Sequence, residues 1–260
     1  MKLFNIIRFN LKSALKIKNI IFYILGCLFF IFLIKSIHEK NNINYIFPFV
    51  GIYKNDFAVK MSYYFYIGFF LCFSDVFICN FFHFLNYFCL KIRNLTTIKF
   101  SLLLILLKVS LIFTLTILAL SLIILGKEHT NYLFKLINIS TININNLFLN
   151  LFILNSLNLI NTALISCCLR LKLKDVKKSL IITLAFYIFS NELLFSKMKF
   201  IQIFSILGTG NILNISQSNN FIYQYIYGFI ILIVLVLILF KLISKKSLEE
   251  LIIKGDCIYD

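Results

Sequence analysis

This sequence has no tryptophan, only one proline and eight glycines in 260 residues, and its ten acidic residues face 26 basic ones. The scarcity of Gly and Pro, with no detectable internal repeat, argues against an inverted-repeat transporter, whose binding helices are typically interrupted by these residues. Apolar residues are abundant instead: 61% of the chain is hydrophobic and 14% charged, against roughly 45–50% and about 25% in soluble domains. We therefore predict an integral membrane protein.

Several sequence motifs of enzymes are also missing. The chain contains no G-x-x-x-x-G-K-[ST], no H-E-x-x-H and no G-x-S-x-G, so we expect neither a P-loop nor the machinery of an intramembrane hydrolase. Its seven cysteines show no spacing typical of a metal site or a disulfide framework. We predict a protein that is not an enzyme, with no catalytic residue, cofactor or metal of its own.

Apolar runs long enough to cross a bilayer, which takes about 20 residues, recur along the chain. None alternates with a period of two, so we predict helices rather than the strands of a barrel. The expected fold is an all-α polytopic membrane protein that forms a single transmembrane domain over residues 1–260. The six predicted spans are residues 19–37, 62–84, 108–126, 146–168, 179–196 and 221–241.

The net charge of +16 is distributed in short basic patches between the apolar runs. This pattern indicates membrane topology rather than a nucleic-acid surface. With the N-terminus in the cytosol, most of the bases fall on cytosolic segments, so we predict an N-in/C-in protein with a cytosolic tail at 242–260. Tyr63, Tyr64 and Tyr66 would then form an aromatic belt at the outer interface. The abundance of Phe, Ile, Asn and Lys, which have AT-rich codons, suggests the plasma membrane of an AT-rich bacterium.

The first 18 residues differ from the spans because basic and apolar residues alternate with a helical period. This predicts an amphipathic helix that lies in the cytosolic headgroup plane, the alternative being a simple positive anchor. The apolar positions are Leu3, Ile6, Ile7, Leu11, Ala14 and Leu15.

Residues 85–107 carry several well-separated basic residues, whereas the eighteen residues that follow Lys108 carry no charge. We expect Lys108 to mark the cytosolic start of the third span, with its amine reaching the headgroups. The preceding residues would form a cytosolic, partly amphipathic helix that re-enters the membrane. The alternative is one span from Phe100 with Lys108 inside it, at a cost of about 2.5–3.5 kcal/mol.

Two further connections carry a pattern of their own. Residues 169–178, "LRLKLKDVKK", are expected to form a basic cytosolic loop that sets topology and is suited to contact with anionic lipid or an acidic partner. Residues 196–220 are too apolar for a free loop and too short to cross twice, so we expect a hairpin in the outer leaflet that turns near Gly208 and Gly210.

Two acids fall inside predicted spans, and intramembrane acids are functional candidates by default. Glu192 is expected near the outer surface and solvated. Asp75 is expected either to hydrogen-bond at a helix interface or to belong to a proton relay or metal site, although a metal site needs further converging ligands. The same helix carries Cys72, Cys79, Asn80 and His83.

The order of these segments and the stretch "RNLTTIKFSLLLILLK", from Arg93 to Lys108, resemble the membrane subunit of type-2 ABC exporters. That family includes bacteriocin-immunity, antibiotic-efflux and polysaccharide exporters, and in it the matching segment is the coupling helix that docks into the ATPase. The resemblance implies that Arg93, Thr96, Thr97 and Lys99 contact the ATPase.

The resemblance further implies two kinds of partner: a soluble P-loop ATPase subunit, and a second copy or a sister permease. The substrate would be an amphipathic peptide, an antibiotic or a lipid-like molecule, and no nucleic acid is expected to bind. Two alternatives remain at this point. One is an accessory or immunity protein that binds a partner within the bilayer without a motor, and the other is an ion-coupled carrier that uses Asp75.

Overall fold

The computed structural model describes residues 3–40, 57–84, 95–136, 144–194 and 221–243, which are helical apart from short connections and contain no strand. The predicted all-α class is confirmed for this part of the chain. The predicted hairpin at 196–220, Arg93 and nearly all of the predicted tail lie outside the described residues. The described helices are α1 (Leu3–Ala14), α2 (Ile17–Lys40), α3 (Phe57–His83), α5 (Leu95–Leu136), α6 (Ile144–Leu173), α7 (Val176–Leu194) and α10 (Phe221–Leu242).

Four of these helices are long and apolar enough to cross a membrane. The candidate spans are Tyr63–His83 of α3, Leu95–Leu120 of α5, Phe152–Leu173 of α6 and Tyr225–Leu242 of α10. The pair α1 and α2, bent by 74°, would add a fifth if it counts as one broken span. Helix α7 corresponds to the predicted span 179–196 but is not among the candidate spans. Three of its 19 residues are charged.

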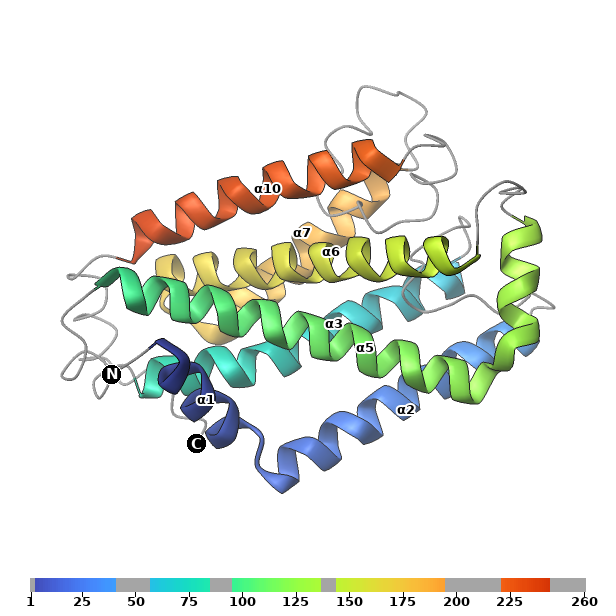
Figure 1. The fold of residues 1–260 in the computed structure, drawn as a ribbon, viewed down its shortest axis with the longest axis horizontal. Helices are drawn as coiled ribbons and strands as arrows, with labels where there is room; N and C mark the ends of the chain where they lie inside the picture. Colours follow the sequence, from blue (N-terminus) through green and yellow to red (C-terminus); the bar gives the residue numbers. More distant parts are fainter. Residues whose placement is uncertain (1–2, 41–56, 85–94, 137–143, 195–220, 244–260) are drawn as a thin grey trace.

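The long helices lie side by side along the long axis of the molecule (Figure 1). Helices α3, α6 and α10 end where α5 and α7 begin, at the left of Figure 1, and α1 lies at the same end. We call this the basic end, because most described Lys and Arg side chains lie there. They include Lys99, Arg170, Lys172, Lys177 and Lys241.

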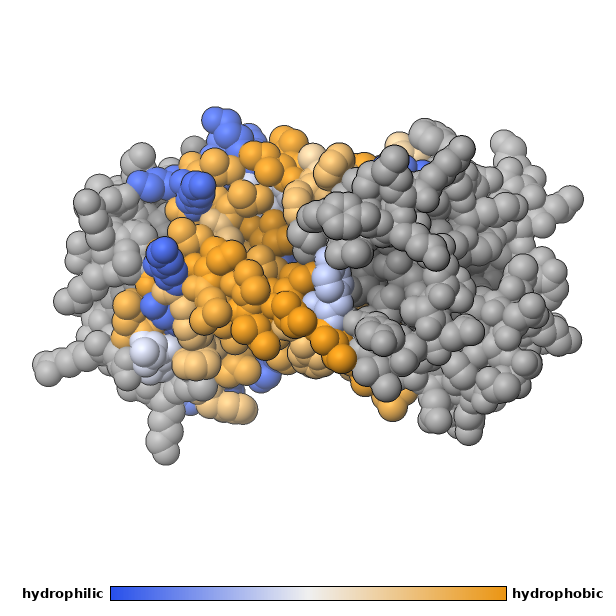
Figure 2. All heavy atoms as spheres, turned by 90° about the horizontal axis from the view of Figure 1, so that it is seen from above, coloured by the Kyte–Doolittle hydropathy of each residue, from blue (hydrophilic) through white to orange (hydrophobic). Residues whose placement is uncertain are grey.

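Helix α6 has the most buried of the four candidate spans, and it contacts α3, α5, α7 and α10. Its candidate span is 78% buried, whereas that of α10 is only 17% buried. Seen from the α10 side, the described surface is a hydrophobic band with hydrophilic residues gathered toward the basic end (Figure 2). An apolar outer helix of this kind is stable only where the surroundings are also apolar, as they are in a bilayer.

Helix α5 differs from the sequence prediction because it runs without interruption through Lys108. The described part of the predicted coupling segment and the predicted third span thus form one continuous helix, and the position of Lys108 at the membrane surface stays a prediction. The reason lies in the local sequence: "KFSLLLILLKVSL" has no Gly or Pro and consists largely of good helix formers, so nothing ends the helix there. The half-buried Lys108 has a partner in space, because its ammonium lies 5.2 Å from the centre of the Phe4 ring of α1.

The predicted basic loop 169–178 is also shorter in the structure. Helix α6 continues to Leu173, and only Lys174 and Asp175 connect it to α7. Lys174 adopts the left-handed conformation (φ 56°) and its N–H donates to the Arg170 carbonyl at 2.9 Å, which closes the end of α6. Asp175 then accepts a 3.0 Å hydrogen bond from the backbone N–H of Lys178 and caps the start of α7. Arg170 therefore lies on a helix.

The N-terminal segment 1–18 forms α1 and the bend into α2. The apolar side chains Ile6, Ile7 and Ala14 are buried, and α1 packs on α3 and α5. The apolar face of α1 therefore packs on α3 and α5, while Phe4 and Arg8 are exposed. The position of α1 in the headgroup plane stays a prediction.

Candidate functional site: a buried ion pair beside a basic pocket

The most unusual feature of the bundle is an ion pair inside it, between Asp75 of α3 and Arg170 of α6. The Arg170 Nη1 atom donates to Asp75 Oδ1 at 2.7 Å, across 95 residues of sequence. Their side chains are only 2% and 4% exposed, respectively. Buried charges are tolerated when each is paired and hydrogen-bonded, so this pair ties α3 and α6 together.

Cys79 is the third member of this group, one helical turn after Asp75 on the same face of α3. Its thiol donates to the second carboxylate oxygen of Asp75 at 3.2 Å and accepts a hydrogen bond from Arg170 Nη1 at 3.0 Å. The guanidinium carbon of Arg170 also lies 5.6 Å from the centre of the Phe82 ring. Both carboxylate oxygens of Asp75 are thus engaged at the interface between α3 and α6.

The sequence prediction selected Asp75 but missed Arg170, because that residue was assigned to a cytosolic loop. A signal was available: an acid in a span requires a nearby positive partner. Arg170 is the only arginine among the bases of 169–178, and it directly follows an apolar run. Its planar guanidinium group suits a buried carboxylate better than the ammonium group of lysine does.

Asn80 connects the same part of α3 to α1. Its side-chain amide donates to the Asn10 carbonyl at 3.1 Å and to Ser13 Oγ at 2.5 Å. In return the side-chain amide of Asn10, which is fully buried, donates to the Phe77 carbonyl at 3.3 Å. These reciprocal bonds hold the short helix α1 on α3.

A pocket of about 510 Å³ opens at the bend between α1 and α2, beside the end of α3. Its lining combines the polar groups Ser13, Asn19 and Asn80 with the bases Lys16, Lys18 and His83. Cys79 also lines this pocket, and so joins it to the buried ion pair. The described lining includes bases and no acid, which suits an anionic group.

The structure therefore gathers Asp75, Asn80 and His83 on one stretch of α3 but gives them different partners. Asp75 pairs with α6, Asn80 bonds to α1, and the exposed His83 ring packs edge-on against Phe84 at 4.9 Å. Within the described ranges, no group of three or more His, Cys, Asp or Glu side chains could hold a metal ion.

The predicted coupling residues occupy the first turns of α5. Thr96 is exposed, and the Thr97 carbonyl accepts a 2.6 Å hydrogen bond from Ser101. Lys99 is half-buried, and its ammonium donates to the backbone carbonyl of Phe240 near the end of α10. The same ammonium lies 5.6 Å from the centre of the Phe240 ring. Lysine at a helix C-terminus satisfies carbonyls that lack helical partners, so Lys99 has a role inside this chain.

A stripe of buried amides runs along α6 from the ion pair toward the opposite end of the bundle. Asn155 donates to the Tyr66 hydroxyl at 2.9 Å, and Asn158 donates to the Tyr187 hydroxyl at 3.0 Å. Tyr187 in turn donates to Tyr63 at 3.0 Å. The tyrosines expected to form an interfacial belt are instead buried, where they link α3, α6 and α7.

A second ion pair lies at the opposite end of α3. The Lys60 ammonium is 2.9 and 2.7 Å from the two carboxylate oxygens of Glu192 on α7, and the Tyr64 hydroxyl donates to the first of them at 2.8 Å. The Lys60 side chain is 12% exposed and that of Glu192 is 44% exposed. Glu192 is thus partly exposed, as predicted, and has partners that the sequence did not identify.

Comparisons with protein-family models, with curated proteins and with solved structures gave no match.

Proposed function

We propose that this chain is the membrane-spanning subunit of an ATP-driven exporter whose ATP is hydrolysed by a separate P-loop subunit. Its six spans would be α2, α3, α5, α6, α7 and α10, with both termini and the basic end in the cytosol, in the plasma membrane of a bacterium. Two such subunits, identical or related, would enclose the path of an amphipathic peptide, an antibiotic or a lipid-like substrate. The primary support is the order of the segments and their resemblance to type-2 exporters.

The structural observation that carries the proposal is the attachment of α1. This helix is bent 74° from α2 and packs on both α3 and α5. The Asn10–Asn80 bonds fasten it to α3, and the Asp75–Arg170 pair fastens α3 to α6. A displacement of α1 would therefore pass to the centre of the bundle through directional polar contacts, which is what a mechanically coupled transporter requires.

The outer side of α1 has the chemistry of a docking surface. Arg8 and Lys12 are exposed there, beside the exposed ring of Phe4. A basic surface with an aromatic centre suits a partner with acidic residues around an apolar depression. We therefore assign the ATPase contact to α1 together with Thr96 and the start of α5, and we give Lys99 a structural role alongside any contact it makes.

Photocrosslinking in the native host tests this assignment. A photoreactive phenylalanine analogue at Arg8 or Lys12 is expected to capture a P-loop ATPase, identified by mass spectrometry, in a complex that also co-purifies in mild detergent. The matched control is the same analogue at the exposed Met61, which lies on the first turns of α3 at the opposite end. Capture at Met61 as well as α1, or no ATPase at either place, would reject the exporter.

The buried acid also favours a second candidate, an ion-coupled carrier. Asp75→Asn alone does not separate the two, because it leaves Arg170 buried without its countercharge and weakens any version of this bundle. The double substitution Asp75→Asn with Arg170→Gln removes both charges. An exporter of the proposed kind should keep its ATPase in this variant, because the assigned ATPase contact lies on α1 and the start of α5, whereas an ion-coupled carrier should lose transport. A protein that purifies alone and transports nothing would be the motor-free accessory protein.

A further inference from the structure

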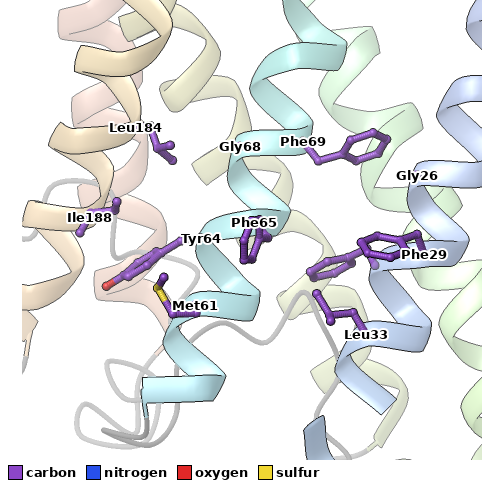
Figure 3. Close-up of a pocket in the computed structure, with 11 residues that line it drawn as sticks. Gly26, Phe29, Leu33, Met61, Tyr64, Phe65, Gly68, Phe69, Leu184 and Ile188 are labelled. Carbon is purple, nitrogen blue, oxygen red and sulfur yellow. The ribbon is translucent and has the colours of Figure 1, made fainter. Parts of the chain in front are cut away.

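An apolar pocket of about 390 Å³ lies between α2, α3 and α7, on the outside of the bundle and toward the Lys60–Glu192 end (Figure 3). Phe29 and Leu33 of α2 form one wall, Met61 and Phe65 of α3 the floor, and Leu184 and Ile188 of α7 the far side. The volume is within the range of roughly 300–1,000 Å³ that is typical of ligand pockets.

Two glycines shape this pocket in opposite ways. At Gly26 of α2, an added Cβ would lie 2.1 Å from the Phe69 ring, so glycine there admits the ring between the two helices. At Gly68 of α3, an added Cβ would meet nothing within 4 Å. A side chain at position 68 would therefore extend into open space inside the pocket without displacing any wall. The chain leaves this space empty at the cost of a glycine in a helix interior.

The polar groups of the pocket stand at one edge. Tyr64 lines it, and the Tyr64 hydroxyl is directed to Glu192. Met61, which follows Lys60 in sequence, lines the pocket at the same edge. Ile188, one helical turn before Glu192 on α7, lines it there as well. The described lining is thus apolar apart from Tyr64, and the Tyr64 hydroxyl bonds the carboxylate of Glu192, which is 44% exposed, against 12% for Lys60.

From this arrangement we infer that the pocket binds the alkyl chain of an amphiphile whose positively charged head group, cationic or zwitterionic, contacts Glu192. An alkyl chain requires apolar walls without hydrogen-bonding groups, and the lining supplies them. The α3 part of the lining runs from Met61 to Phe69, roughly 12 Å of helix, which matches a chain segment rather than a folded molecule. This site needs no ATPase, so its test is independent of the proposed function.

The test uses the purified full chain in lipid nanodiscs. Two probes have the same alkyl chain with a terminal diazirine, one with a trimethylammonium head and one with a sulfate head. We expect the trimethylammonium probe to label peptides from Gly26–Leu33 and Met61–Phe69 at least several-fold more than the sulfate probe. In Glu192→Gln the preference for the trimethylammonium probe should be lost, because the carboxylate is gone and the Lys60 ammonium remains.

Gly68→Leu fills the pocket and provides the decisive variant. It should reduce pocket labelling severalfold while the melting temperature stays the same or rises, because leucine favours the helix and its Cβ would have open space around it. The matched control is Ala185→Leu, which introduces the same side chain at an exposed position of α7 that does not line the pocket, and it should label like the wild type.

Three results would overturn the inference. The first is undiminished labelling in Gly68→Leu. The second is labelling of the exposed face of α10 as strong as that of the pocket, which would indicate bulk lipid alone. The third is a preference for the sulfate head.

Discussion

Helix α3 takes part in two ion pairs, one toward each end, and the two have several features in common. In each, the closest nitrogen–oxygen distance is 2.7 Å, and a third group one helical turn along α3 donates to the acid. The third group is Cys79 for Asp75–Arg170 and Tyr64 for Lys60–Glu192. The environments differ: the first pair is at most 4% exposed, whereas Glu192 in the second is 44% exposed.

This difference separates a structural pair from one available to a ligand. Deep in the bundle, neither Asp75 nor Arg170 can turn to water, so each depends on the other and the pair fixes α3 against α6. At the other end, Glu192 can exchange Lys60 for water or a charged ligand at little cost. Distance alone does not distinguish the two pairs, but their exposure does.

Loss of one partner of the buried pair should have the largest effect. Arg170→Leu leaves the Asp75 carboxylate without its countercharge inside the bundle, and we expect a loss of about 3–5 kcal/mol of stability. The measurement is thermal unfolding in mild detergent, followed by the yield of monodisperse protein.

A double variant is the control for that prediction. Asp75→Leu with Arg170→Met removes both charges, and should recover most of the stability because no buried charge remains unpaired. A double variant as unstable as Arg170→Leu would show that packing, and not the missing countercharge, accounts for the loss.

Loss of the third group, Cys79 or Tyr64, should also cost more stability at the buried pair than at the exposed one, but the difference should be smaller. Cys79→Ala removes a buried hydrogen-bonding group from both Asp75 and Arg170, and we expect a cost of about 1–3 kcal/mol. Tyr64→Phe removes a single bond to a partly exposed carboxylate, which water can replace, so the cost should be at most about 1 kcal/mol. Equal losses in the two variants, measured by thermal unfolding, would remove the distinction between the pairs.

Removal of the exposed pair should have a smaller effect still. For Glu192→Gln we expect a loss of about 0–1 kcal/mol, after allowance for solvent screening. Any loss should shrink further when salt is raised to about 1 M, where the Debye length is roughly 3 Å, whereas the Arg170→Leu loss should persist. Melting temperatures of both variants at low and high salt check this. A stability loss in Glu192→Gln that is the same at both salt concentrations would contradict it.

The sequence was informative wherever a local pattern decides the structure. Apolar runs predicted helices that the structure contains in the described ranges, and the period of Ile6, Ile7 and Ala14 predicted the side of α1 that is buried. The acid at position 75 was recognised as exceptional because charge inside an apolar run is costly wherever the chain goes.

The errors concern partners that only the fold brings together. The basic run around Arg170 was interpreted as topology because a charge count does not show which base faces inward, and its partner lies 95 residues away. Likewise, Lys108 was expected to mark the cytosolic start of a span because no partner is near it in sequence, although the Phe4 ring is near it in space. The ATPase contact expected for Lys99 stays a prediction, but the sequence did not show that Lys99 also donates to α10, 141 residues later.

The smallest effect should come from Asp175, an acid outside the candidate spans. The backbone N–H of Lys178 and the Lys178 charge hold the Asp175 pKa below its ordinary value of 3.8. The stabilisation is therefore fully present above that ordinary value and is lost as the pH falls through the lower folded one. Asp175→Asn keeps a good helix cap but no charge, so wild type should melt slightly higher near neutral pH, and the gap should close at pH below 3.8. A gap for Asp175→Asn that stays constant with pH would mean that its charge contributes nothing to the start of α7.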